Sequence, residues 1–252
     1  MAKIRNSNPK TSSGGYERLL GNKDMADIFT KAQSTVISNG TELEKIITER
    51  ANIIEDLDDF MSKVNSGQMG NGVFLCTKKV TKKSSYRLEG HEPDFLIFNI
   101  NDNGKVAHVI ELKDGDAFDT KKSAGEKNSL KQFKMHLGSM IEFRTDYKIC
   151  AFNQSYKEKI ISGFKNAFAI DEVWTGRDFC NELGIDYDEI INQRKNDAID
   201  NYDFVLDALA EMEDVQNRVF KKAHIVIDES GVHFIDNDEK WWKPLFLIRS
   251  HN

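Results

Sequence analysis

The sequence has few cysteines, few prolines and no long apolar segment. Its three cysteines, Cys76, Cys150 and Cys180, are odd in number, widely spaced and without a Cys-x-x-Cys pair. This usage favours neither a disulfide framework nor a thiolate zinc site, and it fits a reducing cytoplasm. No apolar run approaches the ~18 residues of a membrane-spanning helix, and residues 1–15 lack the apolar core of a secretion signal. We therefore expect a cytoplasmic protein with no membrane partner.

With three prolines in 252 residues, the chain also lacks a linker rich in Ser, Gly and Pro. This length can bury a sizeable core, so we expect one compact domain. Within it we distinguish an N-terminal arm and helix (1–39), a core (40–185) and an acidic extension of helices and a hairpin (186–252). The extension is suited to packing or dimerisation.

The net charge of −6 is unevenly distributed along the chain. Residues 186–252 carry 15 acidic and 8 basic side chains, whereas the preceding 185 residues have a net charge of +1. Two basic stretches lie in that near-neutral part: Lys78, Lys79, Lys82, Lys83 and Arg87, and then Lys121, Lys122, Lys127, Lys131 and Lys134. A face that binds nucleic acid is possible there, although lysine runs also form ordinary solvated surfaces.

Periodicity predicts a mixed α/β sheet with helices on its faces. Thr41, with Glu44 three residues later, has the spacing of a helix-starting capping box after Gly40. The expected helices span residues 23–38, 41–62, 127–142, 155–167 and 186–222. The expected strands span residues 73–80, 94–100, 105–113, 147–153 and 172–175, with a further hairpin at 224–236.

The strand pair 94–113 brings acidic and basic side chains together. A four-residue turn at 101–104 would place Asp94 opposite Glu111, whereas a two-residue turn at Asn103-Gly104 would place it opposite Lys113. In either register Lys113 projects on the same face as Glu111, because side chains alternate along a strand. Two facing carboxylates require a compensating cation, and oxygen ligands suit Mg²⁺. A nearby lysine can orient or help deprotonate water and neutralise charge, as phosphodiester hydrolysis requires.

Glu92-Pro93-Asp94 followed by Glu111-Leu112-Lys113 resembles the PD-(D/E)xK signature of the nuclease superfamily that includes most type II restriction endonucleases. The resemblance covers about residues 40–175. It implies a restriction-endonuclease-like core in which Asp94, Glu111 and Lys113 are catalytic. It also implies that Asp94 and Glu111 bind Mg²⁺, with Glu44 of a Gly-x-x-x-Glu pattern as a further ligand. The capping box remains an alternative role for Glu44.

The resemblance further implies a sequence-specific endonuclease of double-stranded DNA that acts as a homodimer, with a separate cognate DNA methyltransferase. A repair or structure-specific nuclease of the same fold, or a non-catalytic nucleic-acid-binding module, remains an alternative. In this family a loop and helix after the motif approach the DNA backbone, which suggests phosphate contacts for Lys121, Lys122, Lys131 and Gln132. The acids Asp114, Asp116 and Asp119 favour a solvated loop over a larger metal site, and Trp241 with Trp242 fits a core plug or a dimer surface.

Overall fold

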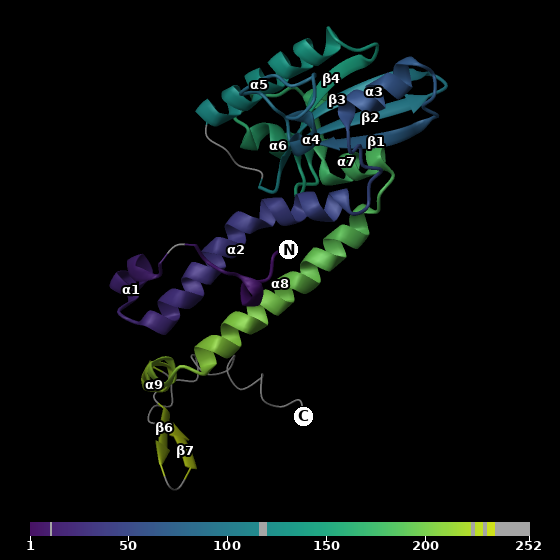
Figure 1. Cartoon of the computed structure of the whole chain (residues 1–252). Coiled ribbons are helices and arrows are strands. Elements are labelled where there is room, and N and C mark those ends of the chain that lie inside the picture. Colours follow the sequence, from purple (N-terminus) through teal and green to yellow (C-terminus); the bar gives the residue numbers. More distant parts are fainter. Residues whose placement is uncertain (11, 116–119, 223–224, 229–230, 235–252) are drawn as a thin grey trace. The chain divides into compact units, whose positions relative to one another are not determined.

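The computed structural model describes residues 1–10, 12–115, 120–222, 225–228 and 231–234 (Figure 1). The expected residues Asp116, Asp119, Trp241 and Trp242 lie outside these ranges. The chain forms two compact units, one from Ser38–Lys195 and one from Ala2–Ile37 together with the described residues from Asn196 onward. No helix in the described part is long and apolar enough to cross a bilayer.

The first unit is built on a five-stranded sheet whose order follows the sequence, β1-β2-β3-β4-β5 (Figure 1). β2 pairs antiparallel with both of its neighbours, β1 and β3, whereas β3, β4 and β5 pair in parallel. The strands are β1 (Gly72–Thr77), β2 (Phe95–Asn101), β3 (Gly104–Lys113), β4 (Arg144–Ala151) and β5 (Val173–Thr175). The predicted mixed sheet flanked by helices is confirmed.

Helices cover both faces of this sheet, because alternate residues along each strand are apolar on both sides. On β2, Leu96 and Phe98 belong to one core, and Phe95 and Ile97 to the other. The first core is closed by α3 (Leu57–Asn65), α5 (Thr120–Gly138) and α6 (Lys157–Gly163). The second is closed by the end of α2 (Lys23–Thr48), by α7 (Gly176–Leu183) and by the start of α8 (Tyr187–Ala210). All three cysteines are buried and free.

The predicted helix start at Thr41 is wrong. Helix α2 runs without interruption from Lys23 to Thr48 and passes through Gly40. A glycine inside a helix costs only about 1 kcal/mol, and the buried side chains of Leu43, Ile46 and Ile47 anchor the segment that follows it. Glu44 therefore lies in the interior of a helix and does not cap one.

The predicted continuation of that helix to residue 62 is also wrong. The backbone after Thr48 leaves the helix and pairs with the edge of β1, where Ile54 N–H donates to Leu75 O (2.8 Å) and Leu75 N–H donates to Asn52 O (2.8 Å). A new helix, α3, then begins after Asp56, whose side chain accepts from the Asp59 N–H. The apolar residues at 53 and 54 are thus used for strand pairing.

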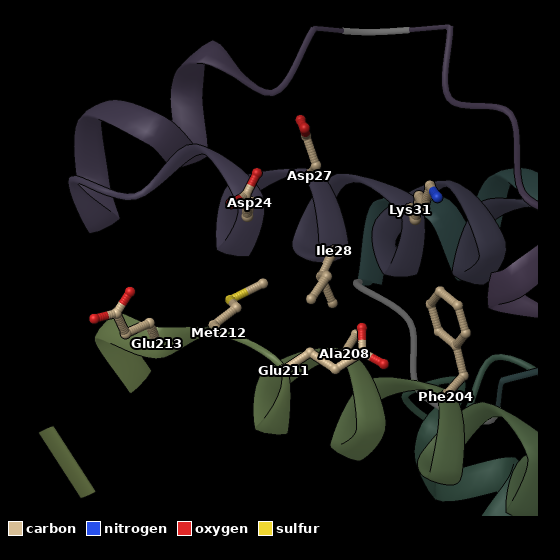
Figure 2. A pocket seen from close by; sticks show the side chains of 9 residues that line it. All are labelled: Asp24, Asp27, Ile28, Lys31, Phe204, Ala208, Glu211, Met212 and Glu213. Carbon is tan, nitrogen blue, oxygen red and sulfur yellow. The ribbon is translucent and has the colours of Figure 1, made fainter. Parts of the chain in front are cut away.

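The second unit is built mainly of helices. Its elements are η1 (Ile4–Asn6), α1 (Gly14–Leu20), the first half of α2, the second half of α8, α9 (Glu213–Lys222), and the hairpin of β6 (Ile225–Asp228) and β7 (Gly231–Phe234). The single helix expected over 186–222 is therefore two, α8 and α9. A cavity of about 480 Å³ is lined by α2 and the α8–α9 segment, with Ile28, Phe204 and Met212 between the helices (Figure 2).

Two short elements complete the first unit. Helix α4 (Lys78–Thr81) follows β1 directly, and the 3₁₀ turn η2 (Ile170–Glu172) leads into β5. Because α4 begins where β1 ends, its first residue stays in register with the neighbouring strand β2. This places the start of α4 beside the segment that precedes Phe95.

Candidate active site

The hairpin of β2 and β3 has the register that a four-residue turn predicts. Asn101 pairs with Gly104 and Phe95 pairs with Ile110, so Asp94 follows in line with Glu111. The alternative register, in which Asp94 faces Lys113, is wrong. Asp94 stands immediately before β2, and Glu111 and Lys113 belong to the last residues of β3. All three lie at the same end of the sheet.

Both oxygens of the Asp94 carboxylate are engaged. Its Oδ2 accepts from the backbone N–H of Leu112 (3.0 Å), and its Oδ1 accepts from Lys78 Nζ (3.2 Å). Lys78 is held there by its own backbone, because its N–H donates to Asp94 O (2.9 Å). The carboxylate is thus fixed on one side by the sheet and on the other by an ammonium group.

Glu111 and Lys113 form an ion pair that a third residue extends. Lys113 Nζ donates to Glu111 Oε1 and also lies 3.0 Å from Glu126 Oε1 on α5. Glu111 is buried, with 8% of its surface exposed. Burial opposes the charged ammonium, but the carboxylates of Glu111 and Glu126 outweigh it and raise the pKa of Lys113. Lys113 is therefore a protonated donor at neutral pH.

Glu44 approaches the same group from α2. The residue as a whole is exposed to solvent. Its carboxyl group is nevertheless partly desolvated, and this desolvation and the negative charge of Asp94 raise the pKa of Glu44. The same carboxyl interacts with the charges of Lys78 and Lys113. The structure therefore brings Glu44 into the electrostatic field of the predicted catalytic residues.

The cluster holds more negative than positive charge. Its acids are Glu44, Asp94, Glu111 and Glu126, and its bases are Lys78 and Lys113. With every group ionised, the net charge is −2. Burial and the nearby Asp94 carboxylate raise the pKa of Glu111 to about 7, although Lys113 opposes the shift. When no other cation neutralises it, the cluster thus binds a proton more tightly than an isolated glutamate does.

This raised pKa predicts a pH-dependent stability in the presence of a chelator. The contribution of Glu111 to the free energy of unfolding is complete below the pKa of an ordinary glutamate and is lost as the pH rises through about 7. We expect the Tm of the wild type to fall between about pH 5 and pH 8 relative to that of Glu111→Gln, by roughly 2–4 °C per kcal/mol.

Comparison with Glu111→Gln separates the titration of Glu111 from the titration of other groups. His108 also has a raised pKa: burial opposes its charge, but hydrogen bonds to Asp146 and Glu182 outweigh burial. That contribution is lost with rising pH in both proteins and cancels in the difference. Parallel curves of Tm against pH for the two proteins would contradict the assignment to Glu111.

The donor atoms fit a hard divalent cation. Among the described residues, the charged groups that interact in the cluster are carboxylates and lysine ammonium groups. In the part of the chain that the structure describes, no three His, Cys, Asp or Glu side chains are grouped to hold a metal ion by themselves. Mg²⁺ needs only one or two carboxylates, because water and substrate phosphate complete its coordination.

The predicted DNA-binding residues all lie exposed on α5 but face different directions. Lys121 and Lys122 are in its first turn, and Lys122 precedes Glu126 by one helical turn on the same face. Lys131 and Gln132 lie roughly 120–140° around the helix from Glu126. Of these four residues, Lys122 therefore shares the face of Glu126, and Lys131 and Gln132 lie on other faces of the helix.

Other residues near the motif hold the structure together. Asp114 accepts from Arg194 Nη2 (2.6 Å) and from Asn153 Nδ2 (2.8 Å), so its carboxylate secures the end of β3. Lys127 of the second basic stretch pairs with Glu172 (2.7 Å) and donates to Ala167 O (2.9 Å). These contacts fit structural roles.

Lys78 and Glu126 belong to the cluster but are not predicted from the sequence. The register of β1 against β2 pairs Thr77 with Phe95, so the next pair is Lys78 and Asp94. This signal depends on knowing that β1 adjoins β2. No sequence spacing links Glu126 to Lys113, because the packing of α5 on the sheet brings them together.

The chain is closely similar to a known enzyme over most of its length. The type II restriction enzyme HhaII of Haemophilus parahaemolyticus is 45% identical over 226 residues, which cover 88% of this chain and 99% of that enzyme. No family model matches the chain, and no solved structure matches it. The aligned region is long enough to include both the sheet and most of the helical unit.

Proposed function

The chain belongs to the type II restriction enzymes and is thus a site-specific deoxyribonuclease, and we propose that it hydrolyses DNA at a Mg²⁺-dependent centre formed by Asp94, Glu111 and Lys113. The observation that carries this proposal is the cluster of four carboxylates and two lysines at one end of the sheet. With every group ionised, its net charge of −2 is the charge that one divalent cation neutralises. Asp94 and Glu111 would hold the ion, with Glu44 beside it.

The residues of the chain have distinct tasks in this proposal. When bound, Mg²⁺ supplies a Lewis acid that polarises the phosphodiester and activates water. Lys113 Nζ, kept protonated by Glu111 and Glu126, donates to the attacking water or to the phosphate oxygens and stabilises the negative charge that develops there. The Leu112 N–H fixes the orientation of Asp94. Glu126 positions Lys113.

We also propose that the fold is that of the PD-(D/E)xK nucleases. Asp94 stands at the start of the second strand, and Glu111 and Lys113 stand at the end of the third. The mixed sheet with helices on both faces fits that fold. The catalytic residues would then occupy the positions that the signature assigns to them.

A homodimer acting on double-stranded DNA in the cytoplasm, with a separate methyltransferase, completes the proposal. Exposed apolar side chains in the second unit support a role in dimerisation, among them Val36 (70% exposed), Ile37 (74%), Ile199 (60%) and Tyr202 (65%). Sedimentation analysis would give the mass of a dimer. A monomer under cleavage conditions would contradict this part of the proposal.

The function is tested by digesting plasmid and phage DNA with the purified protein. We expect discrete fragments in Mg²⁺, none in EDTA, and one short sequence at all fragment ends. A smear of fragments would favour a nuclease of low specificity, and DNA binding without metal-dependent cleavage would favour a binding module. The fragment ends also identify the duplex needed for kinetic work.

Glu44→Gln is expected to weaken cleavage at low Mg²⁺ without lowering the Tm. The substitution removes a carboxylate whose charge the fold disfavours, so the Tm should be unchanged or higher. Cleavage at low Mg²⁺ should fall by ~10-fold if Glu44 contributes to metal binding. Glu42→Gln, two residues earlier and on another face of α2, is the control. Wild-type cleavage by Glu44→Gln across a Mg²⁺ titration would exclude Glu44 from the metal site.

A further inference from the structure

We propose that Lys78 is an active-site residue with two successive partners: Asp94 Oδ1 in the absence of a divalent cation, and a phosphate of the bound DNA once the cation takes that oxygen. The inference rests on the proposed function and extends it. It concerns a residue that neither the sequence signature nor the comparison assigns to the site. The cation and Lys78 would compete for Asp94 Oδ1, so metal binding and DNA binding would be coupled through this lysine.

The two oxygens of the Asp94 carboxylate are not equally open to a metal ion. Oδ2 accepts from the Leu112 N–H at 3.0 Å, within the backbone of β3. Oδ1 is the other oxygen, and Lys78 Nζ lies 3.2 Å from it. A divalent cation that binds Oδ1 would stand next to the ammonium group, and the two positive charges repel each other. Metal binding at Asp94 therefore displaces Lys78.

The two lysines of the cluster, Lys78 and Lys113, differ in the number of carboxylates that they contact. Lys113 contacts two acids, Glu111 and Glu126, so it keeps Glu126 as a partner when Glu111 binds a metal. Across the described ranges, Asp94 is the one carboxylate within ion-pair distance of Lys78. Displacement consequently frees Lys78 and leaves Lys113 in place.

The fixed backbone of Lys78 limits where its freed ammonium group can move. The Lys78 backbone is fixed by its hydrogen bond to Asp94 O (2.9 Å), so the base of the side chain cannot leave the site. Its side chain is 42% exposed, against 14% for that of Asp94. The flexible stem thus reaches toward solvent, where a DNA phosphate is the anion that a lysine binds.

The test compares Lys78→Met, which keeps the length of the stem and removes the charge, with Lys79→Met at the adjacent exposed residue. Calorimetric titration with Mg²⁺, without DNA, should give Lys78→Met a Kd about tenfold lower than that of the wild type, because the competing ammonium is gone. Lys79→Met should bind Mg²⁺ like the wild type. Lys78→Arg, which restores the charge, should restore the weaker binding.

The second measurement uses single-turnover cleavage at saturating Mg²⁺. The enzyme concentration that gives half the maximal rate should rise several-fold for Lys78→Met, and the slope of its logarithm against log salt should fall by about 1, as for one lost phosphate contact. An unchanged Mg²⁺ affinity in Lys78→Met would overturn the proposal, and so would an unchanged half-saturating concentration. If the wild-type protein neither bound Mg²⁺ nor cleaved DNA, the proposed function would fail. If the wild type did both and Lys78→Met behaved in the same way, only the role of Lys78 would be refuted.

Discussion

Glu111→Gln is expected to abolish cleavage in Mg²⁺, and Asp94→Asn is expected to do the same. Each substitution removes a charged oxygen ligand and preserves the shape of the side chain, so the loss of rate should exceed ~10³-fold while the fold is kept. The amide oxygen of Asn can still accept from the Leu112 N–H that now bonds to Asp94 Oδ2. Single-turnover cleavage of one cognate duplex measures the effect.

The same hairpin offers a control for this pair. Asp102 lies in its turn, at the opposite end from the cluster, and accepts from Asn71 Nδ2 (2.6 Å). Asp102→Asn should therefore cleave at the wild-type rate. DNA binding by Asp94→Asn and Glu111→Gln should be intact or tighter, since negative charge facing phosphate is removed. Activity near the wild-type level in either variant would show that the metal ligands are misassigned.

Lys113→Ala is expected to lose at least ~10²-fold in cleavage rate with little change in DNA affinity. The reason is that the ammonium acts on the attacking water and the developing charge, which exist in the transition state. Gel-shift affinity and single-turnover cleavage on the same duplex, at one salt concentration, separate the two effects. A binding module would behave in the opposite way, with no cleavage to lose and a salt-dependent loss of binding.

Lys105→Ala is the matched control for the lysine. Lys105 belongs to the same strand, β3, at its other end, where its ammonium lies 5.9 Å from the Phe143 ring centroid. Its removal should leave the cleavage rate unchanged. Lys113→Met, which keeps an apolar stem, checks that lost packing is not the cause. Unchanged cleavage by both Lys113 variants would end the catalytic interpretation of residues 94–113.

The sheet and the core of the site could be predicted because their determinants are local. The turn at 101–104 and the alternating side chains of the two strands together place Asp94 and Glu111 at one end of a hairpin. The observed pairing of Asn101 with Gly104 confirms that register. Short-range spacing leaves two registers open for this hairpin, and both bring Asp94 to the end of the strand pair that holds Glu111 and Lys113.

Features that depend on tertiary packing were predicted less well. Gly40 resembles a helix break, but the buried residues after it keep α2 continuous. Ile53 and Ile54 fit a helical period, yet the edge of β1 provides strand partners for this segment. Glu126 and Lys78 reach the cluster only because α5 and β1 pack beside β3 and β2. No single segment contains this information.

The location of a bound metal tests the central claim most directly. Crystals of the protein soaked in Mn²⁺ would give an anomalous difference map in which the metal is identified by its own scattering. We expect a peak between Asp94 Oδ1 and the Glu111 carboxylate, with Lys78 Nζ withdrawn from Asp94 and Lys113 Nζ still beside Glu126. A peak at another group of acids, in a protein that cleaves DNA in the same metal, would contradict the assignment of the active site.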